Sequence, residues 1–442
     1  MNLKTRLIVP LRDGLGYCPN VRLLAAWREF GRGRLSSSVA QRAARLARAL
    51  ALAESPGIEA AARSALERQP GIENAAVWRA VVFSLPRYAK MMRDDPALTR
   101  SIILKSPGGN GEKGVLLMYF EYNWARLLLG VPDEEFRWIE EHYDLVLATS
   151  WSPTDYATLA LALSKLRGTV FVQSCNYEEM AKIERFHPRL KCLPNLPCDW
   201  INPDLYHPKP FAERTTDIVM VANWGEFKRH WDLFRALAKL PPDLKVLLIG
   251  QKEGGRTKEL IRRLAAQFGA RQELEIHQSI PISEVAAHQC QAKVSVIMSR
   301  REGCCVAAVE SLFAGCALAM RSDAHVGPLA YINEQTGARL RPGHIADDLR
   351  SLLARSGALH PREWAVANLA CQVSHAKVNA MLRHEAIRVG KSWTRDIALP
   401  QWRPYPTFVK REQQDAMRQD YELLHQKWPA VFSASLWSES WR

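Results

Sequence analysis

Two glutamates eight residues apart are the side chains in this sequence best spaced for chemistry. Glu302 lies in a polar loop at residues 299–303, directly after the apolar run 293–298, and Glu310 lies in the helical stretch 304–314 that follows. The first turn of such a helix has free backbone N–H groups that can hold an anionic oxygen. Eight helical residues span roughly 12 Å. The spacing therefore predicts a ligand with hydroxyl-rich groups at both ends and phosphates between them.

The two carboxylates are expected to bind different parts of that ligand. Glu302 would accept hydrogen bonds from sugar hydroxyls and Glu310 from a ribose, while the N–H groups at the helix start hold a diphosphate. The alternative is that Glu302 complements the helix dipole and that Glu310 is a solvated surface residue. Most neighbours of Glu310 are apolar, including Leu312 and Phe313, so a carboxylate there needs a partner. Spacing alone leaves both interpretations open.

A pair of cations, Lys228 and Arg229, is the second feature. It follows the apolar run 217–222 and precedes the helical stretch 230–240, where positive charge opposes the helix dipole. A dipole-stabilising role is therefore excluded. Lysine as a point charge and arginine as a planar fork would neutralise a diphosphate. The alternative is a solvated basic loop.

The elements around these residues predict a parallel sheet in the second half of the chain. Strands are expected at residues 217–222, 244–250, 273–277, 293–298 and 317–320, with helices between them at 230–240, 257–268, 283–291 and 304–314. Their nearly uninterrupted Val, Ile, Leu and Met are typical of strands buried on both faces. Right-handed crossovers would bring the loops carrying Lys228 and Glu302 to one edge of the sheet, where open α/β sheets bind ligands.

The first half of the chain shows a similar alternation. Strands are expected at residues 3–9, 115–120, 145–149 and 169–173, with helices at 38–53 and 133–142. Prolines between residues 194 and 210 exclude a regular helix and indicate an inter-domain linker. Helices are expected again from residue 361 to about 390, and one more near 413–427.

The Glu302-x7-Glu310 motif resembles the signature of retaining GT-B glycosyltransferases, especially those of glycosyltransferase family 4. The similarity covers about residues 190–345 and includes Pro194-Asn195 with Asp199, Tyr206-His207-Pro208, Gly250, and Thr336-Gly337 with Pro342. It implies an α/β fold of GT-B type, with two Rossmann-like domains whose parallel sheets face a central cleft. The expected domains are 1–208 on the acceptor side, 209–392 binding the nucleotide sugar, and a tail at 393–442 that packs back on the first domain.

The resemblance also implies an activity and a set of site residues. The reaction would move a hexose-like sugar from a nucleotide diphosphate donor to a hydroxyl acceptor, with retention of the anomeric configuration. Lys228 and Glu302 are the implied catalytic residues, contacting the diphosphate and the sugar, and Glu310 would contact the ribose. The implied donor-binding set is Asn223, Lys228, Arg229, Gly250, Arg301, Glu302, Gly303, Cys304, Cys305 and Glu310.

Two departures from the family pattern leave other functions open. Asn223 stands where the family usually has an arginine, a charge that Arg229 or Arg301 would restore, and the loop at 173–179 lacks the family's histidine. A GT-B epimerase or hydrolase of nucleotide sugars is one alternative. A non-catalytic protein that binds polyanions or a membrane surface through a degenerate site is another. No metal ion or other cofactor is expected, because the nucleotide sugar is a co-substrate.

Composition narrows the class of protein and its partners. The 442 residues carry a net charge of +14, and residues 1–53 hold ten Lys and Arg against Asp13 and Glu29, which favours an anionic partner. Nine cysteines are too few for a disulfide-stapled secreted chain, so a cytoplasmic protein is expected. Within 38–53 an apolar stripe runs beside Arg42, Arg45 and Arg48. This helix could bind the acidic inner face of a membrane, or it could pack on the first domain. Nucleic acid is not expected as a partner.

Overall fold

The computed structural model describes residues 3–85, 88, 100–402 and 406–433. These residues form two compact units. The C-terminal unit comprises residues 198–374 together with 3–12, and the N-terminal unit comprises residues 13–197 together with 375–433. Each unit contains its own sheet and is described by itself.

The C-terminal unit is built on a six-stranded sheet in which all strands are parallel. The order of its strands is β11-β10-β9-β6-β7-β8. The strands are β6 (Thr216–Val221), β7 (Val246–Gly250), β8 (Leu274–Gln278), β9 (Ala292–Ile297), β10 (Ala317–Arg321) and β11 (Gly337–Leu340). Five of the six were predicted from their apolar runs, and these predictions are confirmed.

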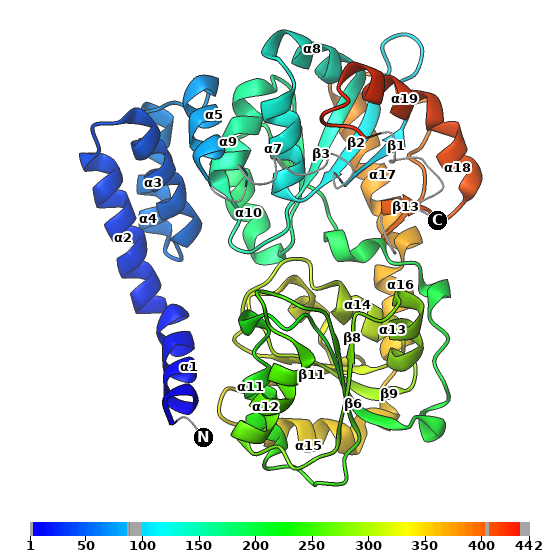
Figure 1. The fold of residues 1–442 in the computed structure, drawn as a ribbon. Helices are drawn as coiled ribbons and strands as arrows, with labels where there is room; N and C mark the ends of the chain where they lie inside the picture. Colours follow the sequence, from blue (N-terminus) through cyan, green and yellow to red (C-terminus); the bar gives the residue numbers. More distant parts are fainter. Residues whose placement is uncertain (1–2, 86–87, 89–99, 403–405, 434–442) are drawn as a thin grey trace. The chain divides into compact units, whose positions relative to one another are not determined.

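Helices cover both faces of this sheet, as Figure 1 shows. One face is covered by α11 (His230–Leu237), α12 (Lys258–Phe268) and α15 (Ile345–Arg355), and the other by α13 (Ile282–Gln289) and α14 (Val306–Phe313). The chain continues through α16 (Pro361–Leu369) and α17 (Cys371–Arg388). Side chains of β9 and β10 are almost all buried because both faces are covered.

The N-terminal unit contains a five-stranded sheet in the order β1-β2-β3-β4-β5. Its strands are β1 (Ser101–Lys105), β2 (Gly114–Tyr119), β3 (Tyr143–Ala148), β4 (Val170–Gln173) and β5 (Leu190–Cys192). Strands β2 to β5 pair in parallel, while β1 joins the edge antiparallel to β2. The connecting helices are α7 (Glu121–Gly130), α8 (Asp133–His142), α9 (Tyr156–Lys165) and α10 (Tyr177–Phe186). The predicted α/β class with two Rossmann-like units is confirmed.

Within the described residues of the N-terminal unit, four helices follow α1 (Leu3–Gly16) and precede this sheet. They are α2 (Pro19–Leu35), α3 (Val39–Leu52), α4 (Pro56–Arg68) and α5 (Ala75–Ser84). The apolar stripe predicted within 38–53 lies on α3, where Ala43, Leu46 and Leu50 are at most 1% exposed in the main core of the unit. Of the two fates expected for this stripe, packing on the first half of the chain is therefore confirmed.

The last part of the chain supplies a further piece of the N-terminal unit. It contains the antiparallel pair β12 (Pro400–Trp402) and β13 (Pro406–Phe408), then α18 (Arg411–Ala416) and α19 (Arg418–Lys427). The backbone N–H of Thr394 donates to Glu112 Oε1 at 2.8 Å, and Glu112 forms a buried ion pair with Lys105 at 2.6 Å. Leu424 is fully buried in the core.

The strand predicted at residues 3–9 is wrong. Leu3–Gly16 forms helix α1. The run Leu7-Ile8-Val9 fits a strand as well as a helix, but Leu7, Leu11 and Leu15 recur every four residues, which is the helical spacing. The proline-rich segment at 194–210 holds only the short 3-10 helices η2 (Pro197–Trp200) and η3 (Pro203–Leu205), as its prolines predict.

Candidate functional site

The strand order of the C-terminal unit marks one place on its sheet where a ligand is expected. After β6 the chain adds β7 and β8 on one side, and after β9 it adds β10 and β11 on the other. The order therefore reverses between the neighbouring strands β6 and β9. Ligands of open α/β sheets bind outside the carboxyl ends of the strands at such a switch point. The loops that carry Lys228 and Glu302 follow these two strands.

Lys228 and Glu302 meet across these loops. The Lys228 ammonium group forms an ion pair and hydrogen bond with Glu302 Oε2. The Lys228 side chain is 15% exposed and that of Glu302 is 4% exposed, so the pair is largely withdrawn from water. Burial alone would lower the pKa of Lys228, but the Glu302 carboxylate outweighs it and raises that pKa. Lys228 therefore stays charged here.

The second oxygen of Glu302 has no partner within the described parts of the chain. Oε1 is buried and accepts no hydrogen bond, and the Oγ of Ser299 in the same loop also lacks one. Unsatisfied buried polar atoms are costly and uncommon, and they are found at sites that bind ligands or ordered water. A carboxylate with one oxygen held by lysine and one oxygen free can accept a hydrogen bond from a hydroxyl group.

The start of α14 is shaped by Cys305, whose φ of 45° places it in the left-handed region. This conformation turns the chain sharply from the loop into the helix. Burial raises the pKa of the Cys305 thiol far above its usual range, and the adjacent Glu302 carboxylate raises it further. Cys305 is thus a packing residue rather than a nucleophile, and Cys304 beside it is equally buried. They and Gly303 contribute backbone to the loop.

Glu310 lies inside α14 and is 2% exposed. The alternative that it is a solvated surface residue is therefore wrong, as its apolar neighbours indicated. Its carbonyl accepts the N–H of Ala314 at the end of the helix. Glu302 is also buried, so both glutamates of the motif are held in the protein and neither faces bulk water.

The two arginines predicted at the site are both buried. Arg229 is 3% exposed, pairs with Asp232 at 2.9 Å and lies over the Trp231 ring at 4.6 Å. Asp232 also pairs with Arg321 of β10, so Arg229 belongs to a charge network that joins α11 to the sheet. Arg301 is 8% exposed, and its backbone bridges to His325. Donor binding by Arg229 and Arg301 stays a prediction.

Asn223 and Gly250 shape the loop after β6. The Oδ1 of Asn223 accepts the N–H of Gly225 at 3.1 Å, which folds the loop into an Asx turn. A Cβ on Gly250 would lie 2.2 Å from the carbonyl oxygen of Ala222 and 2.8 Å from the Trp224 ring. Only glycine allows β7 to end this close to the β6 loop. Contacts of Asn223 and Gly250 with a donor stay predictions.

One residue that the sequence did not single out lies at the same place. His230 begins α11, is 2% exposed, and has no partner for its Nε2 among the described residues. Burial, together with the charges of Lys228 and Arg256, lowers its pKa to about 3. In the sequence, His230 is notable only because it follows Lys228 and Arg229, and this position does not reveal that its ring is buried.

A possible metal-binding group lies elsewhere in the C-terminal unit. Ligand atoms of Glu275 and His277 on β8 and of His288 on α13 lie within 4.8 Å of one another, the one such group in the described part of the chain. It contains none of the residues described above. Of the helices that the structure describes, none is both long and apolar enough to span a membrane.

Residues 204–362 match the family model described as Glycosyl transferases group 1. This segment contains every site residue discussed above. No curated protein sequence matches the chain.

Among solved structures, the chain is similar to sucrose-phosphate synthase of Thermosynechococcus elongatus, at 18% identity over 62% of this chain and 74% of that chain, with a TM-score of 0.49. It is similar to Anabaena Alr3699/HepE in complex with UDP, at 14% identity over 61% and 78%, with a TM-score of 0.48. The GtfA/B complex matches at 16% identity over 58% of this chain and 55% of that one, with a TM-score of 0.45.

Proposed function

We propose that this protein moves a hexose-like sugar from a nucleotide diphosphate donor to a hydroxyl acceptor, because residues 204–362 match the family model of glycosyl transferases group 1. Glycosyl transfer is the activity of the family. The donor class, the hexose, the acceptor and retention of the anomeric configuration are the parts that we propose.

One observation carries the proposal. The Lys228–Glu302 pair lies at the switch point of the sheet, and its carboxylate keeps one buried oxygen without a hydrogen bond. On donor binding, the Lys228 ammonium would contact the diphosphate, and Glu302 would accept hydrogen bonds from hydroxyls of the sugar. Both residues would exchange one partner for another, so neither charge is left bare.

The chemical step depends on stabilising the departing diphosphate. Negative charge builds on the leaving oxygen as the bond to the sugar breaks, and a fixed cation in a water-poor site stabilises it. Lys228 supplies that cation, with the backbone N–H groups of Gly303 to Cys305 beside it. In this proposal Arg229 and Arg301 add positive charge behind the site, and Asn223 and Gly250 border the donor. Glu310 would bind the ribose.

The proposal is tested with a panel of nucleoside diphosphates and nucleotide hexoses. A true donor raises the melting temperature, because a ligand that binds only the folded state stabilises it. Release of the nucleoside diphosphate should then rise when a suitable hydroxyl acceptor is added. Lys228→Ala should abolish the stabilisation by donor, while Lys239→Ala, an exposed lysine of the same unit, should not.

Two outcomes would replace the proposal by its alternatives. Consumption of the nucleotide sugar at the same rate with and without any acceptor would indicate an epimerase or hydrolase. No response to any nucleotide, with salt-dependent binding to polyanions, would indicate a non-catalytic protein.

We further propose that the protein acts in the cytoplasm, with a glycan, a lipid-linked sugar or a small molecule as acceptor. The excess of positive charge in residues 1–53 supports contact with the acidic inner face of a membrane. Co-sedimentation with vesicles should depend on acidic lipid, and binding indifferent to lipid charge would remove the membrane from this proposal.

A further inference from the structure

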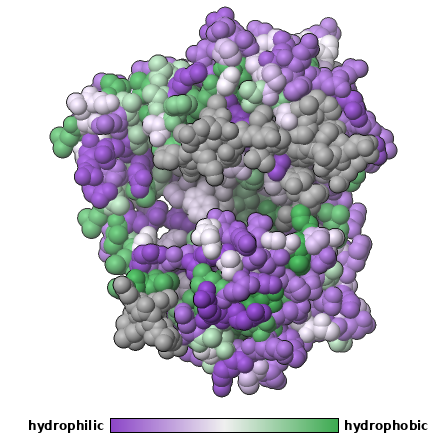
Figure 2. Space-filling view, in the orientation of Figure 1, coloured by the Kyte–Doolittle hydropathy of each residue, from purple (hydrophilic) through white to green (hydrophobic). Residues whose placement is uncertain are grey.

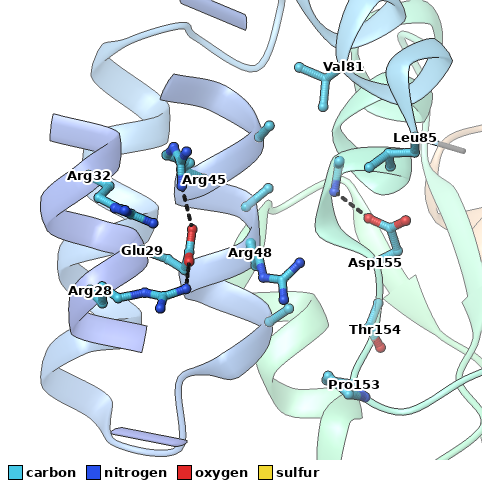
Figure 3. Close-up of a pocket in the computed structure, with 14 residues that line it drawn as sticks. Arg28, Glu29, Arg32, Arg45, Arg48, Val81, Leu85, Pro153, Thr154 and Asp155 are labelled. Carbon is cyan, nitrogen blue, oxygen red and sulfur yellow. Dashed lines mark hydrogen bonds and ion pairs between the residues drawn. The ribbon is translucent and has the colours of Figure 1, made fainter. Parts of the chain in front are cut away.

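A pocket of about 720 Å³ opens in the N-terminal unit, remote in sequence from the site described above. It lies among α2, α3, α5 and the loop that precedes α9, as Figure 3 shows. We call it the arginine pocket, because four of its lining residues are Arg28, Arg32, Arg45 and Arg48. Its volume is in the range of small-molecule sites.

Two of these arginines share one buried carboxylate. Arg28 and Arg45 donate to opposite oxygens of Glu29, at 2.9 and 3.1 Å. Glu29 is 4% exposed, and although burial alone would raise its pKa, the two guanidinium groups outweigh it and hold that pKa below its usual value. This triad fixes the arginines of α2 and α3 at the wall of the pocket.

Asp155, the acidic residue on the opposite wall, already accepts hydrogen bonds from the protein. Asp155 accepts the N–H of Ala157 at 3.1 Å and the hydroxyl group of Tyr88 at 2.6 Å, so it caps α9. Four arginines against two carboxylates leave a net charge of +2 in the pocket.

That charge rests on Arg32 and Arg48. Neither guanidinium has a hydrogen bond or ion pair with any residue in the described part of the chain, and both side chains are exposed. In Figure 3, Arg48 extends from α3 toward Thr154 and Asp155 on the other wall. A ligand in the pocket would therefore meet two free, forked donors.

Apart from Thr154, the rest of the lining is aliphatic. It comprises Ala44, Ala47, Ala51, Val81, Leu85, Pro153 and Ala157. Apolar residues also reach the surface nearby, where Leu24 of α2 is 69% exposed and Trp27 is 48% exposed. Figure 2 shows hydrophobic and hydrophilic residues side by side along the left edge of the molecule, over α2. The pocket thus offers charge on one side and an apolar wall on the other.

We infer that the arginine pocket binds a phosphate monoester that carries an apolar group. The charge of +2 complements the phosphate dianion, and guanidinium forks match phosphate oxygens in pairs. The aliphatic wall would cover the hydrocarbon part, which inorganic phosphate lacks. This inference does not depend on the proposed function, because it concerns other residues and a different ligand.

Calorimetric titration of the full chain with hexyl phosphate, inorganic phosphate and hexanol tests the inference. Hexyl phosphate should bind more tightly than either of the other two. Inorganic phosphate can contact only the arginines, and hexanol can contact only the aliphatic wall. The double variant R32A/R48A should weaken binding of hexyl phosphate by at least about tenfold. The double variant R34A/R68A removes two exposed arginines outside the pocket and should bind like the unmodified protein.

Binding to vesicles distinguishes a lipid headgroup in a membrane from a soluble phosphate ester as the source of the phosphate. If the phosphate belongs to a lipid headgroup in a membrane, phosphatidylcholine vesicles containing phosphatidic acid should retain the protein, and R32A/R48A should lose this retention. If the ligand is a soluble phosphate ester, hexyl phosphate binds and the vesicles do not.

Equal binding of hexyl phosphate by R32A/R48A and by the unmodified protein would overturn the inference. So would tighter binding of hexanol than of hexyl phosphate. Loss of donor binding at Lys228 would leave all of these results unchanged.

Discussion

Lys228 and Glu302 make a pair in which each residue stabilises the charge of the other. Replacing Lys228 by Met leaves a buried carboxylate without its cation, which should lower the free energy of unfolding by about 3 kcal/mol. Turnover should fall by about 100-fold or more, because the leaving diphosphate loses its fixed cation. Urea unfolding and release of the nucleoside diphosphate measure the two effects.

A second variant separates the loss of stability from the loss of chemistry. The double variant K228M/E302Q removes both charges and should recover most of the lost stability, to within about 1 kcal/mol. Its turnover should stay low. Recovery of turnover together with stability would show that Lys228 acts only through folding.

His230 predicts how stability depends on pH. Its pKa in the folded protein is about 3, against an ordinary value of 6.5, because burial and nearby cations disfavour the charged ring. The unfolded chain therefore binds the extra proton first as the pH falls. The contribution of His230 to stability is complete above pH 6.5 and declines below it, by about 2 kcal/mol at pH 5.

The variant His230→Phe tests this dependence. Phe should fit among the rings of Trp224 and Phe234, whose centroids lie 5.4 and 6.5 Å from that of His230. The difference in unfolding free energy between pH 7 and pH 5 should shrink by about 2 kcal/mol in the variant. An unchanged difference would mean that His230 is not the group responsible.

At the scale of elements, the end of β7 depends on the absence of a side chain. Gly250→Ala places a methyl group 2.2 Å from the carbonyl oxygen of Ala222, so β6 and β7 must separate there. We expect a loss of more than about 3 kcal/mol in unfolding free energy, because Gly250 belongs to β7 and the N–H of Ala222 donates to Ile249 of β7, so neither backbone can shift freely. Gly57→Ala is the control, since it lies in α4 with open space around it and should stabilise by about 0.5–1 kcal/mol. Equal stability of Gly250→Ala and the unmodified protein in a urea melt would contradict this account.

The same elements show what could be predicted from the sequence. The strands of the C-terminal unit were predictable because burial on both faces demands continuous apolar runs, as in β9 and β10. Strand β11 has only four residues, and Arg339 interrupts its apolar pattern, so it gave no such signal. Strand β1 carries Lys105, whose buried partner Glu112 lies beyond the strand. Short or charged strands form through tertiary contacts that no local pattern records.

The candidate site was predictable to a similar depth. The sequence placed Lys228 and Glu302 in loops after two strands, but it could not show that these strands are neighbours, since strand order is a property of the folded sheet. It also could not show that the carboxylate of Asp232 holds both Arg229 and Arg321, because Arg321 lies on a strand much later in the chain. The residue types at the site could be predicted from the sequence, but the residues with which each of them pairs could not.

At the scale of the whole molecule, the two units differ in how they use the chain. The C-terminal unit draws most of its residues from the continuous segment 198–374, while the N-terminal unit combines 13–197 with 375–433. The core of the N-terminal unit therefore depends on residues near the end of the chain. Leu424, Trp428 and Phe432 all belong to it. A change in this late segment should weaken strands that precede it by some 300 residues.

Leu424→Ala tests this division of the molecule. The side chain is fully buried, so its truncation should cost about 2–5 kcal/mol, whereas Leu423→Ala at a 36% exposed position should cost little. Hydrogen exchange should accelerate in β2 and β3, which share the core with Leu424, and stay unchanged in β6 and β9. Two cores that open separately produce this pattern, because destabilising one leaves the opening free energy of the other intact. Equal acceleration in β2 and in β6 would instead show that the units unfold as one cooperative body.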